Sequence, residues 1–203
     1  YGVEMNHWEA VKWYEKAANQ GNVDAQYSLG RCYGEGTGKR KDFAEAVKWY
    51  EKAAENDNAD AQNSLGYCYQ KGNGVIQDLS KAAEWYRKAA EQGYSNSQYN
   101  LGHCYEYGEG VTQSKATAAE WYRKAADQGD ADAQYKLGVF YENGYGVIKD
   151  EAQAMQWYKK AADQGHESAK EAIDGMESGG LGSAVAAGAA LGGAALIWKF
   201  LNS

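Results

Sequence analysis

One stretch of the chain decides the fold: residues 25–33 read AQYSLGRCY, and residues 43–55 read FAEAVKWYEKAAE. In the first segment Ala25, Leu29 and Tyr33 recur every four residues, which places them on one stripe of a helix. In the second segment the apolar residues recur at intervals of three and four, again the pattern of an amphipathic helix. The stretch therefore predicts two helices, each with one apolar face.

The same stretch returns along the chain with a fixed step of 36 residues. The pair Trp-Tyr begins at residues 13, 49, 85, 121 and 157, the pair Leu-Gly at residues 29, 65, 101 and 137, and a Gly-x-Gly loop at residues 36, 72, 108 and 144. One pair of helices cannot bury both apolar faces alone, so neighbouring pairs must stack into a continuous core. The fold class is therefore all-α, an α-solenoid of helix-turn-helix repeats.

Residue types that cap helices mark the ends of these elements. Side chains able to cap a helix start precede each second helix at Asn6, Asp42, Asp78, Ser114 and Asp150. We expect the second helices to end at Gly21, Asp57, Gly93, Gly129 and Gly165. Gly30 and its copies lie inside the first helices, where glycine costs about 1 kcal/mol relative to alanine. We therefore expect a bulky Trp or Tyr of the facing helix to approach the backbone there.

The 36-residue step also gives the domain organisation. Since the chain begins out of phase and Tyr1 is not an initiator Met, we expect a processed or shortened form of a longer protein. The predicted units are the second helix of an incomplete repeat (1–22), four full repeats (23–58, 59–94, 95–130 and 131–166), a capping helix (167–177) and a Gly/Ala-rich apolar tail (178–203).

These residues carry a resemblance to a known family. The order Ala-x-Ala-Gln-Tyr-x-Leu-Gly, then Tyr-x-x-Gly-x-Gly-Val, then Ala-x-x-Trp-Tyr-x-Lys-Ala-Ala-x-x-Gly resembles the Sel-1-like repeat, a relative of the tetratricopeptide repeat. The resemblance covers about residues 6–173. It departs from the family after the loop valine, where the family often has proline and this chain has Ile76, Thr112 and Ile148. The motif is specific for the fold and weak for the function.

Composition excludes some classes of function. With 21 Lys and Arg against 28 Asp and Glu, the formal charge is −7, so the chain lacks the basic surface on which nucleic-acid binding depends. The hydrophobic content of 44% is sufficient for a packed core. We therefore expect a globular protein that does not bind nucleic acid.

The residues that could carry chemistry have simpler structural explanations. Cys32, Cys68 and Cys104 share one repeat position that Phe140 fills in the last unit, so we expect unlinked, packed thiols. The three histidines form no metal-binding pair, and no nucleophile-base set is suggested by spacing. The Gly-x-Gly loops precede acidic caps that would repel a phosphate, which favours turns. The Trp-Tyr pairs lie on the packing face. We therefore expect no catalytic residues, no metal and no cofactor.

The repeat copies differ most at three positions of the first helix. The second and third of these positions follow the first by three and seven residues, so all three share one face of the helix. In the solenoids that the chain resembles, the first helices line the concave surface and partners bind there. Two interpretations stand, a binding surface for a protein or peptide and a merely solvated face. The residues of this predicted surface are Ser28, Arg31, Glu35, Ser64, Tyr67, Lys71, Asn100, His103, Tyr107, Lys136 and Asn143, with Val139 as the remaining copy.

The tail from residue 178 has a different composition. Residues 178–198 carry no charge, and their length suits a helix that crosses a membrane. Trp198 and Lys199 resemble an interfacial anchor. Against insertion, six glycines weaken the apolar character, and a flexible low-complexity tail is the other interpretation. An inserted tail would leave the repeats in the cytoplasm, and an upstream signal peptide would reverse that topology.

Three hypotheses for function follow. The first is a non-enzymatic scaffold or adaptor that binds a protein or peptide on the solenoid, tethered to a membrane by its tail. The second is a membrane-active protein whose glycine-rich tail inserts into lipid. The third is an enzyme like the cysteine-rich branch of the family, which is linked to β-lactamase activity. That branch has two cysteines in each repeat, whereas this chain has at most one.

Overall fold

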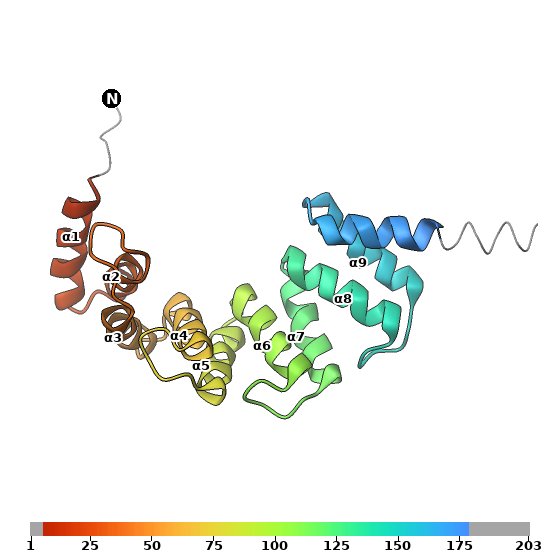
Figure 1. Ribbon diagram of the computed structural model, residues 1–203, viewed down its shortest axis with the longest axis horizontal. Helices are drawn as coiled ribbons and strands as arrows, with labels where there is room; N and C mark the ends of the chain where they lie inside the picture. The colour runs from red at the N-terminus through yellow and green to blue at the C-terminus, as the bar shows by residue number, and fades with distance from the viewer. Residues whose placement is uncertain (1–5, 179–203) are drawn as a thin grey trace, which may run out of the picture.

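The computed structural model describes residues 6–178, and every regular element within that range is a helix. Figure 1 shows the helices following one another along a curve, with α1 and α9 toward its opposite ends. The helices are α1 (His7–Asn19), α2 (Val23–Glu35), α3 (Phe43–Ala54), α4 (Ala59–Lys71), α5 (Leu79–Glu91), α6 (Ser95–Tyr107), α7 (Lys115–Asp127), α8 (Ala131–Asn143) and α9 (Glu151–Asp163), followed by a helical segment at 167–178. The predicted all-α solenoid is confirmed.

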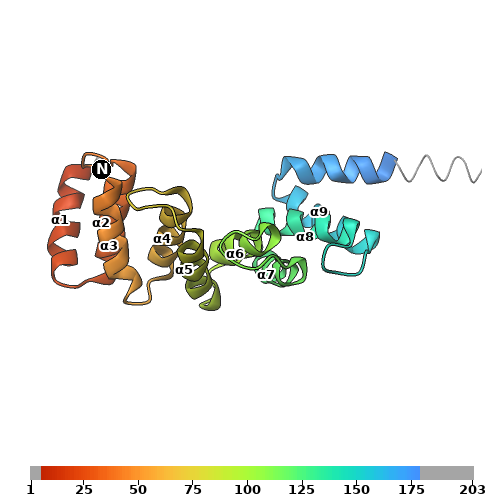
Figure 2. The ribbon, with the colours of Figure 1, turned by 60° about the horizontal axis from the view of Figure 1, so that its bottom comes forward.

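Each helix packs against its neighbour in the chain, so the units stack in sequence order. We call α2, α4, α6 and α8 the first helices, and α1, α3, α5, α7 and α9 the second helices. Figure 1 places α4 toward the inside of the curve and α5 toward its outside. The turned view of Figure 2 shows the same order of helices from α1 to α9.

Side chains cap the helices where the sequence predicts them. The predicted residues before all five second helices accept a hydrogen bond from a backbone N–H of the first turn, as Asp42 does from Glu45 at 3.1 Å. At the other end of these helices the backbone turns left-handed at the predicted glycines, and once at Asp57, where φ is 60°. Local sequence therefore determines where each second helix starts and stops.

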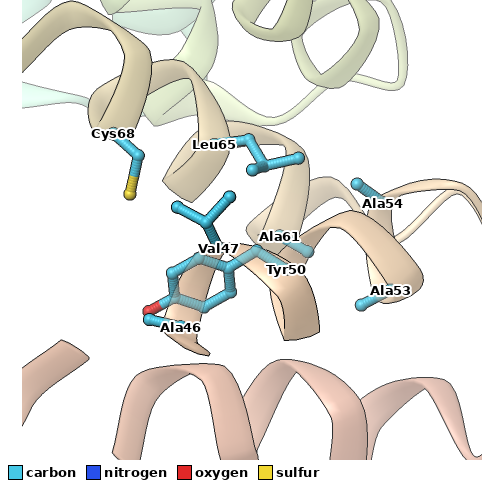
Figure 3. Close-up of a cluster of buried hydrophobic side chains, with 8 residues drawn as sticks. All are labelled: Ala46, Val47, Tyr50, Ala53, Ala54, Ala61, Leu65 and Cys68. Carbon is cyan, nitrogen blue, oxygen red and sulfur yellow. The ribbon is translucent and has the colours of Figure 1, made fainter. Parts of the chain in front are cut away.

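Within each unit, a tyrosine ring of the second helix lies directly on the backbone of the first helix. The ring of Tyr86 covers Gly66, where an added Cβ would come within 2.6 Å of two ring carbons. The same arrangement joins Tyr50 to Gly30, and Figure 3 shows the Tyr50 ring beside Ala46 and Val47 of its own helix. The predicted close approach is therefore confirmed, and the approaching residue is the tyrosine of the Trp-Tyr pair.

The second glycine of each Gly-x-Gly loop connects one unit to the unit before it. Gly110 has φ 71°, and an added Cβ would lie 2.0 Å from the carbonyl oxygen of Leu79 at the start of α5. Gly74 and Gly146 contact the first residues of α3 and α7 in the same way. These loops are therefore turns, as the sequence predicts, and they pack on a helix of the preceding unit.

The tryptophans of the Trp-Tyr pairs lie at the margin of the core. Trp49, Trp85 and Trp121 are half-buried, whereas Trp157 is buried. In all four units the lysine three residues later places its ammonium nitrogen 3.7–4.0 Å from the centre of an indole ring. A cation over the ring face stabilises such a partly exposed indole, which explains why the repeat pairs Trp with Lys.

The two ends of the described chain differ in how well they are covered. In α1 the side chain of Trp13 is 69% exposed, whereas the equivalent Trp157 is 6% exposed. Beyond α9, the helical segment 167–178 adds Ala169 to the buried cluster that contains Tyr158, and Ile173 packs against this cluster. The core therefore has a covering helix after α9 and an uncovered aromatic face on α1.

The tail prediction falls almost wholly outside the part of the chain that the structure describes, since residues 179–203 are not part of it. Within residues 6–178, none of the helices combines the length and the apolar character that crossing a bilayer requires.

Candidate functional site

The predicted binding residues all lie on the four first helices. Their side chains fall into two groups by exposure. The exposed side chains are those of Arg31, Glu35, Tyr67, Lys71, Tyr107 and Asn143. The half-buried side chains are those of Ser28, Ser64, Asn100, His103 and Lys136. We call this set the first-helix surface. Tyr67 and Tyr107 are 50% and 53% exposed and are its two large exposed aromatic side chains.

Hydrogen bonds between neighbouring units join part of this surface. On α4, the Oδ1 of Asn63 accepts hydrogen bonds from Ser97 Oγ at 2.8 Å and Asn100 Nδ2 at 3.0 Å, both on α6. The first helices of adjacent units are therefore in direct polar contact, and the surface is continuous across them.

A buried ion pair makes the next connection, from α6 to α8. Lys136 Nζ lies 3.0 Å from Glu106 Oε2 and donates to the hydroxyl of Tyr107 at 3.2 Å. The Tyr122 hydroxyl donates to the same Oε2 at 2.6 Å. Lys136 is a predicted partner-binding residue, but its ammonium group is paired with Glu106 and Tyr107 within the solenoid.

Burial and hydrogen bonding shift the pKa of the Glu106 carboxyl group in opposite directions. Burial alone would raise the pKa of its carboxyl group, but the hydrogen bonds from Tyr122 and Lys136 outweigh it, and the pKa lies below its usual range. The pKa of Lys136 is raised, because hydrogen bonds to Glu106 and Tyr107 outweigh its burial. Both shifts favour the charged forms, so the pair is ionised at neutral pH.

His103 and Tyr107, both on α6, form a second cluster of predicted binding residues. Their ring centres are 4.5 Å apart, and His103 Nδ1 lies 3.5 Å from Glu109 Oε2 in the following loop. Glu109 also accepts a hydrogen bond from Gln70 Nε2 at 3.1 Å, which ties the loop back to α4. The structure therefore brings His103, Tyr107 and Glu109 together, whereas Arg31 pairs within its own helix with Glu35 at 3.0 Å.

Sequence reasoning missed one repeat position that connects the core to this surface. In three units it carries a polar residue that accepts a hydrogen bond from the second-helix tyrosine hydroxyl: Gln70, Glu106 and Glu142 accept from Tyr86, Tyr122 and Tyr158. A buried tyrosine hydroxyl usually has a partner, which is the signal that could have predicted this position. In the first unit the residue is Gly34.

The three thiols are unlinked, as predicted, and all three are buried. Burial raises the pKa of Cys68 to about 11 and that of Cys104 to about 12, so neither is an activated thiolate at neutral pH. Phe140 at the equivalent position is also buried. The position therefore serves packing. Among residues 6–178, no three side chains of the His, Cys, Asp and Glu types gather into a group that could hold a metal ion.

The repeats match a known family. The family model described as Sel1 repeat matches residues 2–22, 23–58, 59–94, 95–130 and 131–166. None of the curated proteins compared with the chain is significantly similar to it.

Several solved structures resemble this one. A protective antigen of uropathogenic Escherichia coli, described as displaying an SLR fold, is 41% identical with a TM-score of 0.84 over 88% of this chain, which spans 38% of the antigen's length. A Sel1 repeat protein from Oxalobacter formigenes is 39% identical with a TM-score of 0.79, covering 86% of this chain and 70% of its own. An immunity protein from Pseudomonas aeruginosa is 27% identical with a TM-score of 0.54, covering 82% of this chain and 62% of its own.

The ion pair between α6 and α8 predicts a pH-dependent stability. Replacing Lys136 with Met leaves the buried Glu106 carboxylate without its cation, so we expect a loss of about 1–2 kcal/mol at pH 7, less than for a fully buried pair because both groups keep some solvent contact. Since the pKa of Glu106 is lowered in the folded state, its contribution is present above the unfolded value of about 4.3 and is lost as the pH falls.

Chemical denaturation of both proteins at pH 7 and pH 3 measures this difference. We expect the gap between wild type and Lys136→Met to shrink strongly at pH 3. Lys170→Met is the matched control, because the Lys170–Glu167 pair is on the surface, and it should change stability little at either pH. A gap of equal size at both pH values would contradict the account.

Proposed function

Since this chain belongs to the Sel1 repeat family, whose members are commonly protein-interaction scaffolds, we propose that it is a non-enzymatic scaffold that binds a protein or peptide on the first-helix surface. The partner lies across several units, because each unit supplies only two or three side chains. The repeat fold presents this surface, and the residues that differ between copies give it specificity.

The two exposed tyrosines carry this proposal. Tyr67 and Tyr107 keep about half of their surface in solvent, whereas the tyrosines of the Trp-Tyr pairs are buried in the four full repeats. Tyrosine and arginine are the residue types most often found at the energetic centre of protein interfaces. Tyr67 and Tyr107 lie at different repeat positions on the adjacent first helices α4 and α6, which are in polar contact.

The charge of the surface favours a polypeptide over a polyanion. Arg31 is paired with Glu35, Lys136 is paired with Glu106, and Lys71 is exposed. Because neither sign dominates, the surface lacks the run of cations that a nucleic acid or polyphosphate would require. A mixed surface with exposed aromatic rings suits a peptide with its own polar and apolar side chains.

The proposal extends to the location of the protein. We place the repeats in the cytoplasm, held at a membrane by residues 178–198, because these 21 residues carry no charge and are long enough to span a bilayer. Flotation of the full chain with liposomes, compared with a chain ending at residue 177, tests the tether. Flotation of only the full chain would support it, and equal behaviour of both chains would refute it.

The proposed surface predicts a specific loss of binding. Peptides selected from a random display library on the immobilised full chain provide the probe. The double variant Tyr67→Ala/His103→Ala should bind the best peptide more weakly by at least about 1 kcal/mol, roughly a fivefold rise in Kd. Its circular dichroism should match that of the wild type, since neither residue lies on the packing stripe.

Loop isoleucines provide a matched control. Ile76→Ala/Ile148→Ala removes two apolar side chains that are 91% and 90% exposed and lie outside the first-helix surface, so the Kd should not change. Unchanged binding by a folded Tyr67→Ala/His103→Ala variant would show that the first-helix surface is only solvated.

A further inference from the structure

A cavity opens on the first-helix surface at the point where one repeat position loses its side chain. In the second unit this position is Gln70, whose Oε1 accepts a hydrogen bond from the Tyr86 hydroxyl at 3.0 Å. In the first unit it is Gly34, and a Cβ added there would lie 3.3 Å from the Tyr50 hydroxyl oxygen. The hydroxyl of Tyr50 is therefore left facing the space that a side chain fills in the other units.

The adjacent residue of the next unit is also small at this point. Glu106 of the third unit is contacted by Lys136 on α8 of the fourth unit. The residue that corresponds to Lys136 beside Gly34 of the first unit is Ser64 on α4 of the second unit. With Gly34 and Ser64 facing each other, a cavity of about 410 Å³ remains. A volume of this size lies within the range of small-ligand sites. Its lining includes Gly34, Tyr50, Asn63, Ser64, Tyr67 and Asn100, together with the charged residues Glu35 and Lys41.

Beside the Tyr50 ring the cavity offers neutral hydrogen-bonding groups, while its two charged lining residues, Glu35 and Lys41, are of opposite sign and both exposed. Figure 3 shows the Tyr50 hydroxyl at the edge of the buried cluster, beside Ala46 and away from Ala53 and Ala54. The Oδ1 of Asn63 is occupied by Ser97 and Asn100, which leaves its amide N–H groups as donors. Phe43 and Tyr67 add aromatic surface to the lining. This set suits an uncharged planar group that accepts and donates hydrogen bonds.

We propose that this cavity binds a glutamine side chain of the partner polypeptide, with its carboxamide oxygen accepting a hydrogen bond from the Tyr50 hydroxyl. The proposal rests on the function proposed above. Gln70 provides the template within the same chain, because it makes this contact with Tyr86 one unit later. The partner supplies across the interface the group that the second unit supplies from its own helix.

Charge distinguishes glutamine from glutamate in this cavity. The carboxylate of Glu106 is buried beside the ammonium group of Lys136. In the cavity Ser64 replaces that lysine. The one cation of the lining, Lys41, is exposed, and its ammonium nitrogen lies 4.6 Å from the centre of the Phe43 ring. The lining also holds the carboxylate of Glu35, so a bound carboxylate would lose solvent beside a like charge and without a buried ion pair. Glu142, whose corresponding neighbour is Ala172, is only half-buried. A neutral carboxamide avoids this cost.

Nuclear magnetic resonance of the labelled full chain tests the cavity directly. The probe is N-acetylglutamine methylamide, for which a Kd on the order of 1 mM is expected from its size. We expect saturable shifts of the side-chain amide signals of Asn63 and Asn100. The glutamate analogue should bind at least about threefold more weakly, and the leucine analogue should give no saturable shift. No saturable shift with the glutamine probe, or equal binding of the three probes, would overturn the proposal.

A variant that fills the cavity provides the second test. Gly34→Gln places a carboxamide beside Tyr50 as Gln70 does beside Tyr86, so it should raise the unfolding midpoint and abolish the probe's shifts. Gly175→Gln is the matched control, since it makes the same change in a helical segment where an added Cβ meets nothing within 4 Å. It should leave the probe's shifts intact. Retained probe binding in Gly34→Gln would overturn the proposal.

A conservative variant covers the case in which Gly34→Gln fails to fold. Tyr50→Phe keeps the ring on Gly30 and removes only the hydroxyl, and it should weaken probe binding by about fivefold. Unchanged affinity in folded Tyr50→Phe would overturn the proposal.

The two proposals fail separately. If a display-selected peptide binds wild type and Gly34→Gln equally but loses affinity in Tyr67→Ala/His103→Ala, the scaffold function stands and the glutamine site is wrong. If no peptide is selected, the scaffold function fails, and the probe titration still decides whether the cavity takes a carboxamide.

Discussion

The contact between a second-helix tyrosine ring and a first-helix glycine is the constraint on which the rest of the structure depends. In four units an added Cβ on this glycine would come within 2.5–2.8 Å of a ring carbon, closer than van der Waals contact allows. The missing side chain sets how near the two helices can approach. Because each pair is closed in the same way, successive pairs present equivalent faces and can stack with one repeated geometry.

The same contact directs a polar group toward the first-helix surface. With the ring on the glycine, the hydroxyl reaches the residue four positions further along the first helix. That residue changes from Gly34 through Gln70 to Glu106 and Glu142. A buried hydroxyl without a partner lowers the stability of the fold, so the residue at this position determines what surrounds it. Glu106 is paired with the ammonium group of Lys136 from the next unit, whereas Gly34 leaves an open cavity. The repeated core therefore generates a surface that differs from unit to unit.

The sequence predicted the features that depend on local spacing. Helix starts at residues such as Asp42, left-handed turns at the helix ends, packed thiols and the close approach at Gly30 all follow from residue type and position within one helix. Of the predicted outward positions on the first helices, the position of Glu35 is exposed in every unit, whereas the position of Ser28 is half-buried in every unit. The sequence also did not predict that Lys136 pairs with Glu106. The hydroxyl partners of the tyrosines were missed because the two residues are sixteen positions apart on different helices. Helical periodicity orders residues on one helix and gives no register between two. The cavity at Gly34 was missed for the same reason, since it arises from two small residues that only the stacking of α2 and α4 brings together.

Comparing Gly66→Ala with Gly175→Ala tests the central contact most directly, because the two changes share one chemistry and differ in surroundings. Alanine is favoured over glycine inside a helix by about 1 kcal/mol, so Gly175→Ala, which meets open space, should raise the unfolding midpoint. At Gly66 the added Cβ meets the Tyr86 ring, and overpacking of this kind costs about 1–3 kcal/mol. The account predicts that Gly66→Ala lowers the unfolding midpoint measured by circular dichroism. A rise equal to that of Gly175→Ala would contradict it.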